Sequence, residues 1–184
     1  MLWRVTVEDR EAKAAIEALL FVSGEPLTAE MLKNILETGE RDIERLMTEL
    51  ISEYQGRASG ILIAEVAHGY QMVTSPDYAE WVRKLLRTAV SWRLSQPAIE
   101  TLAIIAYKQP VIKAEIESIR GVNSDGVLKT LLEKGLIKIL GRKEVPGRPL
   151  MYGTSKGFLQ YFGLKDLSEL PTLRDFEEVK GAAS

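Results

Sequence analysis

The chain has 184 residues, of which 46% are hydrophobic and none is cysteine. That length suits one ordinary domain or two small ones, and the apolar content is enough for a packed core. The lack of thiols excludes disulfides and thiolate metal sites, and it fits a reducing, cytosolic setting. No apolar run approaches the roughly 20 residues of a membrane-spanning helix, and residues 1–10 do not have the pattern of a signal peptide.

The charges are distributed unevenly along the chain. Residues 1–94 carry 11 basic and 15 acidic side chains, residues 95–160 carry 10 and 6, and residues 161–184 carry 3 and 5. A protein that holds DNA through its phosphates usually shows a strong basic excess. Only residues 95–160 show a basic excess, and it is mild.

Three amphipathic helices are predicted in the first half. The first ends before Gly24 and Pro26, because glycine favours a helix C-terminus and proline cannot continue a helix. Thr28 can cap the second helix, which Gly39 ends, and the third covers about residues 40–54. The apolar faces of the three helices consist of Ala15, Ile16, Leu19, Leu20, Met31, Leu32, Ile35, Leu36, Ile43, Leu46, Met47, Leu50, Ile51 and Tyr54.

The spacing of the apolar residues changes after Gly60. Residues 61–63 and 71–74 are predicted to form two short strands. They are joined by a turn at His68-Gly69, in which the glycine supplies the positive φ. A closing helix over about residues 78–90 places on one face Trp81, Val82, Leu85 and Leu86.

The second half repeats this order of elements. Ser95 and Ser124 are expected to cap the first and third helices, which Pro110 and Gly135 end. Between them lies a short helix closed by Gly121. Residues 136–140 and 150–154 are predicted strands on either side of a loop. The inward residues of the helices, including the closing one, are Ile99, Leu102, Ala103, Ala106, Ile112, Ile116, Ile119, Val127, Leu128, Leu131, Leu132, Phe158, Leu159 and Phe162.

The repeat is also visible in the letters, since residues 16–19 recur with one change as residues 99–102, and Pro26 recurs as Pro110. Two copies of one unit with small loop changes produce such a pattern. Three helices followed by a hairpin is the order of a winged helix, whose third helix often enters the DNA major groove. We predict an α+β, mainly helical chain: two tandem winged-helix domains, 1–92 and 93–163, each with three helices and a β-hairpin wing, then a partly disordered tail, 164–184.

Groups that could carry out catalysis are sparse. His68 is the single histidine, so a histidine metal cluster is excluded, and we interpret it as a turn residue. Gly121 and Gly126 have the glycine spacing of a phosphate loop, but no Lys-Ser or Lys-Thr pair follows. The carboxylates lie on solvated helix faces. We therefore expect no enzyme activity, no metal and no cofactor.

DNA and protein remain as alternative targets. The third helix of the first half, residues 40–53, has two arginines against five acids, which would repel phosphates. Its counterpart in the second half is neutral. The second wing carries Arg142, Lys143 and Arg148, and these could touch a phosphate backbone, so a DNA-binding winged-helix transcriptional regulator stays open. Winged helices without basic faces still offer grooves and strand edges to a peptide or helix of another protein.

Several long motifs resemble one bacterial family, segregation and condensation protein B (ScpB). They comprise residues 94–110 and 114–122, then Gly147-Arg-Pro149 and Tyr152-Gly-Thr154 in the second half, and residues 17–26 in the first. The resemblance covers about residues 12–171, and motifs of this length are specific.

This resemblance implies two winged-helix domains without enzymatic activity. It implies a homodimer, formed chiefly through the first domain, that binds the kleisin ScpA. The kleisin bridges the heads of the SMC ATPase, so that ATPase is reached indirectly and no ATP site is expected here. The complex condenses and partitions chromosomes at cell division, which implies a cytoplasmic protein at the nucleoid. Direct DNA binding is expected to be weak or absent, and no membrane partner is expected.

Two sets of residues are candidate contacts. For dimerisation we expect surplus apolar residues of the first domain, with the alternative that all of them fill one core: Phe21, Val22, Ile61, Ile63 and Met72. For kleisin binding the candidates are Tyr107, Ile119, Arg120, Arg142, Arg148 and Tyr152. Here too structural roles remain open: a core position for Ile119, capping of helix carbonyls by Arg120, and packing in the hairpin for Tyr152.

Overall fold

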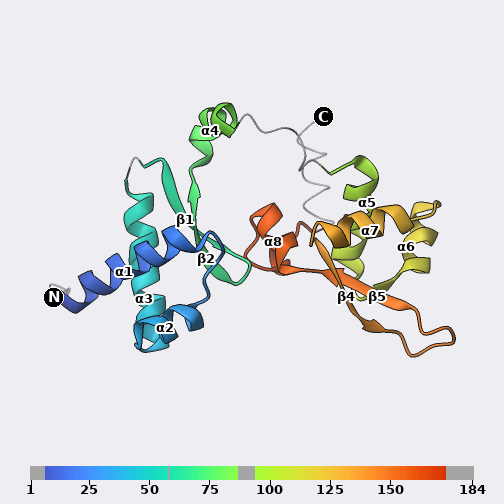
Figure 1. The fold of residues 1–184 in the computed structure, drawn as a ribbon, viewed down its shortest axis with the longest axis horizontal. Helices are drawn as coiled ribbons and strands as arrows, with labels where there is room; N and C mark the ends of the chain where they lie inside the picture. The colour runs from blue at the N-terminus through green and yellow to red at the C-terminus, as the bar shows by residue number, and fades with distance from the viewer. Residues whose placement is uncertain (1–6, 58, 87–93, 173–184) are drawn as a thin grey trace. The chain divides into compact units, whose positions relative to one another are not determined.

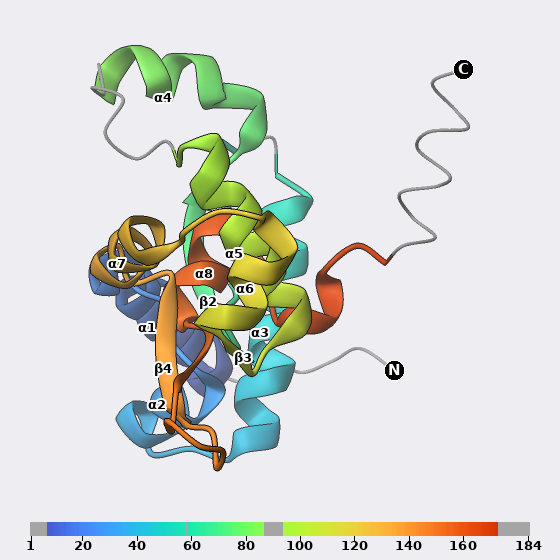
Figure 2. The ribbon, with the colours of Figure 1, turned by 90° about the vertical axis from the view of Figure 1, so that its right-hand side faces the viewer.

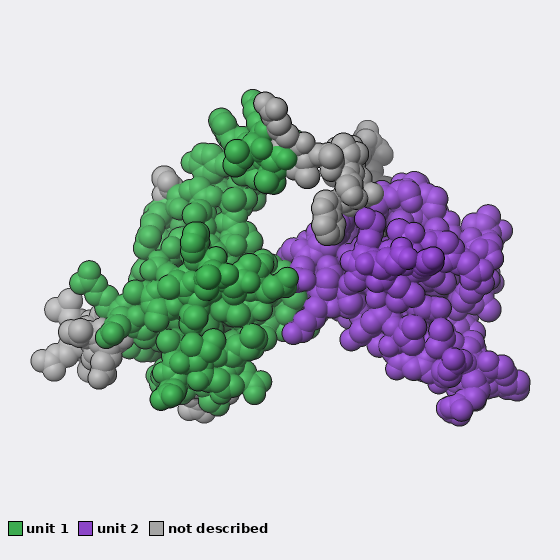
Figure 3. Space-filling view, viewed as in Figure 1, with its two compact units in different colours: residues 1–91 green, residues 92–184 purple. Residues whose placement is uncertain are grey.

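The computed structural model describes residues 7–57, 59–86 and 94–172. The chain divides into two compact units, residues 1–91 and residues 92–184 (Figure 3). Each unit has helices followed by a β-hairpin, so the predicted α+β, mainly helical class with two tandem winged helices is confirmed. The assignment of dimerisation to residues 1–92 and of kleisin binding to residues 93–163 stays a prediction.

Unit 1 has the predicted order of elements (Figure 1). Its elements are α1 (Val7–Ser23), α2 (Ala29–Leu36), α3 (Glu40–Gln55), β1 (Ile61–Val66), β2 (Gly69–Thr74), the 3-10 helix η1 (Pro76–Tyr78) and α4 (Ala79–Leu86). β1 and β2 pair antiparallel with Ile63 opposite Met72. Leu27 adds a bridge to β2, because its N–H donates to the Tyr70 carbonyl (2.9 Å) and its carbonyl accepts from the Tyr70 N–H (2.8 Å).

The core of unit 1 lies between α1, α2, α3 and the hairpin. The predicted faces of α1 and α3 are confirmed for Ile16, Leu20, Ile43, Leu46, Met47 and Leu50. The predicted face of α2 is wrong in part, because Met31 and Ile35 are 46% and 53% exposed while Leu32 is fully buried. α2 has only eight residues and packs mainly on α3, so a single narrow stripe of it faces the core. Thr28 caps α2 as predicted, with its hydroxyl accepting from the Met31 N–H (3.2 Å).

The hairpin turn of unit 1 differs from the prediction. Ala67 and His68 form it, with φ of 51° and 62°, which is the two-residue turn that matches the twist of a hairpin. Gly69 is the first residue of β2 and has no positive φ. A Cβ at Gly69 would lie 2.8 Å from the Leu27 carbonyl oxygen. The glycine therefore serves the close approach of Leu27, which is a tertiary contact that the local sequence does not reveal.

Gly69→Ala should destabilise unit 1 by about 1–3 kcal/mol, because the added methyl group must push the Leu27 backbone away from β2. Urea unfolding of the full chain measures the change. The matched control is Gly56→Ala, since Gly56 has ordinary helical angles and a Cβ there stays 3.4 Å from its nearest neighbour. The control should be neutral or stabilising by about 0.4–1 kcal/mol. Equal losses at both positions would contradict this explanation.

Unit 2 repeats the plan, and adds a three-stranded sheet in the order β3-β5-β4. Its elements are α5 (Gln96–Lys108), β3 (Val111–Ile112), α6 (Lys113–Arg120), α7 (Asp125–Glu133), β4 (Ile137–Arg142), β5 (Leu150–Thr154), α8 (Lys156–Phe162) and the 3-10 helix η2 (Leu167–Glu169). β3 was predicted as helix and is a strand that pairs with β5. Val111 follows Pro110 as Leu27 follows Pro26, so both bridging positions occupy the same place in the repeat.

The predicted inward face of α5 is confirmed for Leu102 and Ala106 and wrong for Ile99 and Ala103. Its buried residues include Thr101 and Ile105, whereas Ile99 is 46% exposed and Ala103 is exposed. Because α5 is apolar around most of its circumference, spacing alone cannot select the inward face. Ser95 and Ser124 occupy N-cap positions, but neither side chain makes the expected capping hydrogen bond. Of the predicted tail, residues 164–172 pack on unit 2, and residues 173–184 lie outside the described residues.

Candidate protein-binding surfaces

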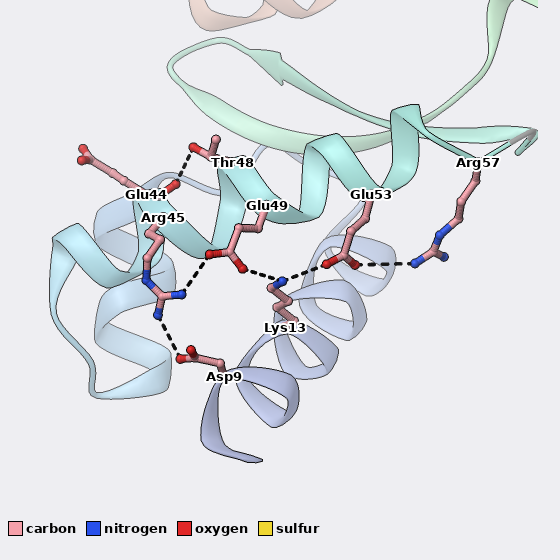
Figure 4. A network of polar contacts seen from close by, with 8 residues as sticks. All are labelled: Asp9, Lys13, Glu44, Arg45, Thr48, Glu49, Glu53 and Arg57. Carbon is pink, nitrogen blue, oxygen red and sulfur yellow. Dashed lines mark hydrogen bonds and ion pairs between the residues drawn. The ribbon is translucent and has the colours of Figure 1, made fainter. Parts of the chain in front are cut away.

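The charged side of α3 is joined to α1 by a chain of ion pairs (Figure 4). The Arg45 guanidinium lies 2.9 Å from Asp9 and 3.0 Å from Glu49. The Lys13 ammonium lies 2.6 Å from Glu49 and 2.8 Å from Glu53. Arg45 is thus held within unit 1, and the neighbouring carboxylates would repel a phosphate. These contacts agree with the expectation that this helix does not read DNA.

The network changes the acidity of its members. The hydrogen bond from Lys13 holds the pKa of the Glu49 carboxyl below its ordinary value, and burial opposes this shift. The hydrogen bond to Glu49 in turn raises the pKa of Lys13. Glu49 therefore stays ionised to lower pH in the folded chain than in the unfolded chain.

Unit 1 should lose stability on acidification through Glu49. A lowered folded-state pKa contributes stability that is present above the unfolded value of about 4.5 and is lost as pH falls through the folded value. We expect the network to contribute about 1 kcal/mol near pH 7. Urea midpoints at several pH values between 7 and 3 should therefore fall less steeply for Glu49→Gln than for the unmodified chain.

Glu80→Gln is the control for this measurement, because among the described residues the ion pair of Glu80 is with Lys84, on the exposed surface of α4. This variant should follow the pH profile of the unmodified chain within about 0.5 kcal/mol. If the Glu49→Gln variant has the same pH profile as the unmodified chain, Glu49 does not contribute to the loss of stability at low pH.

The predicted dimerisation residues divide between surface and core. Phe21 and Val22, in the last turn of α1, are 76% and 77% exposed, and Ile61 is exposed at the start of β1. Ile63 lies in the core and Met72 is half-buried against it. Ile63 is therefore not available to a partner, which corrects the expected face, and the alternative that all five fill one core is also wrong.

α4 presents a larger apolar surface than those candidates. Trp81, Leu85 and Leu86 are 61%, 81% and 62% exposed, and none of the eight residues of α4 is buried. α4 projects from the rest of unit 1 in both views (Figures 1 and 2). The stripe was visible in the sequence, but only the structure shows that nothing within the described part of unit 1 covers it.

The basic residues of the second wing have partners within unit 2. Lys143 lies 2.7 Å from Glu115 of α6 and lowers the pKa of that carboxyl. Arg148 lies 2.9 Å from Glu144, and Arg142 donates to the Arg148 carbonyl (2.9 Å). A phosphate would have to compete with these contacts, of which the exposed Arg148–Glu144 pair is weak.

Three further candidates of unit 2 have different surroundings. The Arg120 side chain is 7% exposed, donates to the Ser124 hydroxyl (3.1 Å) and caps no carbonyl in the described structure. Tyr152 is 8% exposed and lies between the Val111 and Ile139 strands, so it packs in the sheet. Ile119 is 51% exposed, not in the core. It lines a groove of about 670 Å³ beside the start of α6.

Tyr107 lies on the exposed side of α5 and is 52% exposed. Its hydroxyl donates to the Pro171 carbonyl (2.7 Å). It borders an almost wholly apolar cavity of about 280 Å³, whose lining is Ile99, Leu102, Ala103, Ala106, Tyr107, Phe158, Phe162, Leu164, Leu170 and Pro171. The sequence prediction missed this cavity, since it placed Ile99 and Ala103 in the core.

The described residues contain no cluster of three or more histidine, cysteine, aspartate or glutamate side chains that could hold a metal ion. Among the described helices, none has the length and apolar character needed to cross a membrane.

The chain is similar to proteins of one known family. The model of the "Segregation and condensation complex subunit ScpB" family matches residues 14–173. Segregation and condensation protein B of Syntrophotalea carbinolica is 50% identical over 169 residues, covering 92% of this chain and 85% of the relative. That of Symbiobacterium thermophilum is 50% identical over 171 residues, covering 93% and 75%.

Two solved structures are similar as well. The ScpB of Mycobacterium tuberculosis is 35% identical and covers 87% of this chain and 99% of its own, with a TM-score of 0.43. A dimer of an ScpB N-terminal domain complexed with an ScpA peptide is 28% identical, covers 41% of this chain and 95% of its own, and has a TM-score of 0.40.

Proposed function

Because the chain belongs to the segregation and condensation complex subunit ScpB family, we propose that it is a non-enzymatic structural subunit that dimerises and binds the kleisin ScpA. In this role it contributes to chromosome condensation and segregation during cell division, in the cytoplasm at the nucleoid. It reaches the SMC ATPase only through the kleisin. It binds DNA weakly or not at all, and it needs no cofactor.

One observation supports this proposal most directly: apolar side chains are exposed on both units, while the cations Arg45, Lys143 and Arg148 already have carboxylate partners. α4 exposes Trp81 and Leu85, and α5 exposes Ile99 and Tyr107. Exposed apolar stripes of this kind mark surfaces for other proteins. The paired wing of unit 2 gives no specific support to the alternative of a transcriptional regulator.

Self-association is assigned to unit 1. The α4 stripe and the pair Phe21 and Val22 are its most exposed apolar groups. Such side chains gain roughly 1.5–3 kcal/mol each when they are fully buried. A symmetric dimer buries the same patches on both copies, so each exposed residue counts twice.

Kleisin binding is assigned to unit 2. Ile119 and Tyr107 supply exposed apolar area, and Arg142 and Arg148 lie on the wing as a basic rim. The net positive charge of residues 95–160 suits an acidic kleisin segment. The side chains of Arg120 and Tyr152 are buried, so they are not available as direct contacts of the kleisin.

Size-exclusion chromatography with light scattering tests the proposal. The chain alone should have the mass of a dimer at micromolar concentration, and it should co-elute with purified ScpA. Ile119→Glu should weaken the complex at least tenfold by placing a charge on the contact. The control Thr130→Glu, an equal change of charge on the exposed side of α7, should leave it intact. A monomer that elutes apart from ScpA would refute both parts of the proposal.

A further inference from the structure

The exposed side of α5 is a second apolar stripe. Ile99, Ala103 and Tyr107 are spaced four residues apart and so lie along one face of the helix. Phe158 and Phe162 of α8 line the same cavity, with their rings 5.0 Å apart. Ile99 and Phe162 remain 46% and 47% exposed. α5 therefore packs into the core on one side and forms the floor of an open apolar groove on the other.

A strap formed by residues 164–172 crosses this groove. Its Leu164, Leu170 and Pro171 line the cavity of about 280 Å³. A second cavity of about 640 Å³, lined by Lys108, Leu167 and Thr172 among others, shares four lining residues with the first: Ala106, Tyr107, Leu170 and Pro171. The two cavities are thus parts of one groove along α5, with the strap lying across it.

A side-chain hydrogen bond and apolar contacts join the strap to the groove. The Tyr107 hydroxyl holds the Pro171 carbonyl at 2.7 Å. Leu164 and Leu170 are half-buried, and Leu167 is 40% exposed. The Leu164 N–H donates to the Leu159 carbonyl of α8 (2.8 Å). Within the strap, the Lys165 N–H donates to the Glu169 carboxylate (2.6 Å) and the Ser168 N–H to Asp166 (2.7 Å). A segment with its own local order and partly buried anchors can leave the groove at low cost.

We propose that the strap is an internal occupant of the groove that an acidic, leucine-containing segment of the kleisin displaces. This inference rests on the proposed kleisin binding. The chemistry of the displacing segment follows from the strap itself, which alternates leucines with carboxylates at Leu164, Asp166, Leu167, Glu169 and Leu170. Lys108 borders the groove and supplies a positive charge for the carboxylates of the displacing segment.

Because the strap competes with the kleisin, the apparent affinity for ScpA equals the affinity of the open groove multiplied by the fraction of molecules whose groove is open. Releasing the strap should therefore strengthen ScpA binding by about three- to tenfold. Tyr107 then has two successive roles. Its hydroxyl first bonds the strap at Pro171, and after the strap has left, Tyr107 contacts the kleisin.

The experiment uses the full chain and fluorescence-anisotropy titration with labelled ScpA. Leu164→Ser combined with Leu170→Ser releases the strap and should give the three- to tenfold gain. Ile35→Ser, an apolar-to-serine change at a 53% exposed position of α2 in unit 1, should not change the affinity. Ile99→Glu added to the released variant should abolish the gain, because it places a charge on the groove floor. Equal affinity of the released and unmodified chains would overturn the inference while leaving ScpA binding in place.

A second readout separates this inference from the proposed function. An apolar fluorescent dye should bind the released variant several-fold more than the unmodified chain, and a synthetic peptide of residues 164–172 should displace it. If ScpA binds no variant, the proposed function fails, and with it the kleisin as the displacing partner. Unchanged dye binding in the released variant would overturn the strap as a removable occupant.

Discussion

Replacing Trp81 and Leu85 of α4 by glutamate should convert the dimer into a monomer. Both side chains are largely exposed within the described structure of one chain, so the change removes no core contact and should leave unit 1 folded. Burial of two such groups contributes about 3–6 kcal/mol to an interface, and the variant also places like charges on both copies. Sedimentation equilibrium should show dimer dissociation at least 100-fold easier than in the unmodified chain.

Lys84→Glu is the matched control, because it changes the charge by the same two units on the polar side of α4. Lys84 pairs with Glu80 within the helix (2.6 Å), and it should tolerate the change with little effect on the dimer. Phe21→Glu tests the second exposed patch in the same assay. A variant of α4 that remains as dimeric as the control would exclude this helix from the interface.

Leu131→Ala should destabilise unit 2 by about 2–5 kcal/mol and leave unit 1 unchanged. Leu131 is fully buried in unit 2, and a leucine-to-alanine change in a core costs both the transfer of the lost groups and the cavity left behind. Because each unit has its own buried core, we expect the effect to stay within the unit that carries the substitution.

Leu50→Ala provides the reciprocal measurement, since Leu50 is 1% exposed in the core of unit 1. Hydrogen exchange followed by peptide mass analysis reports the opening of each unit separately. Each variant should accelerate exchange in its own unit by about 30-fold or more. Acceleration of both units by either variant would show that they unfold as one.

The helices with one clear apolar stripe could be predicted from the sequence. Over the 16 residues of α3, apolar residues recur every three or four positions among charged ones. Its inward face therefore follows from helical spacing. α5 could not be oriented in this way, because residues on opposite sides of it, such as Ile99 and Ile105, are equally apolar. Which face of α5 is buried depends on the elements that pack against it, and only the tertiary structure shows these contacts.

The features nearest to function depended most on contacts distant in sequence. Gly69 was assigned to a turn, although its lack of a side chain serves the approach of Leu27. The strap lies in the predicted tail, and its contact with Tyr107 joins residues 64 positions apart, which local sequence does not reveal. The paired state of Arg148 and Lys143 likewise needed the structure, since the sequence shows charges but not their partners.

The exposed apolar surfaces of both units suit a polypeptide partner rather than the phosphate backbone of DNA. Titrating the full chain in one buffer at roughly physiological salt, once with ScpA and once with duplex DNA, tests this claim most directly. We predict micromolar or tighter binding of ScpA that weakens only moderately with salt, and DNA binding that is at least tenfold weaker and falls steeply with salt. A sequence-specific DNA complex that is tighter than the ScpA complex at this salt concentration would contradict the account.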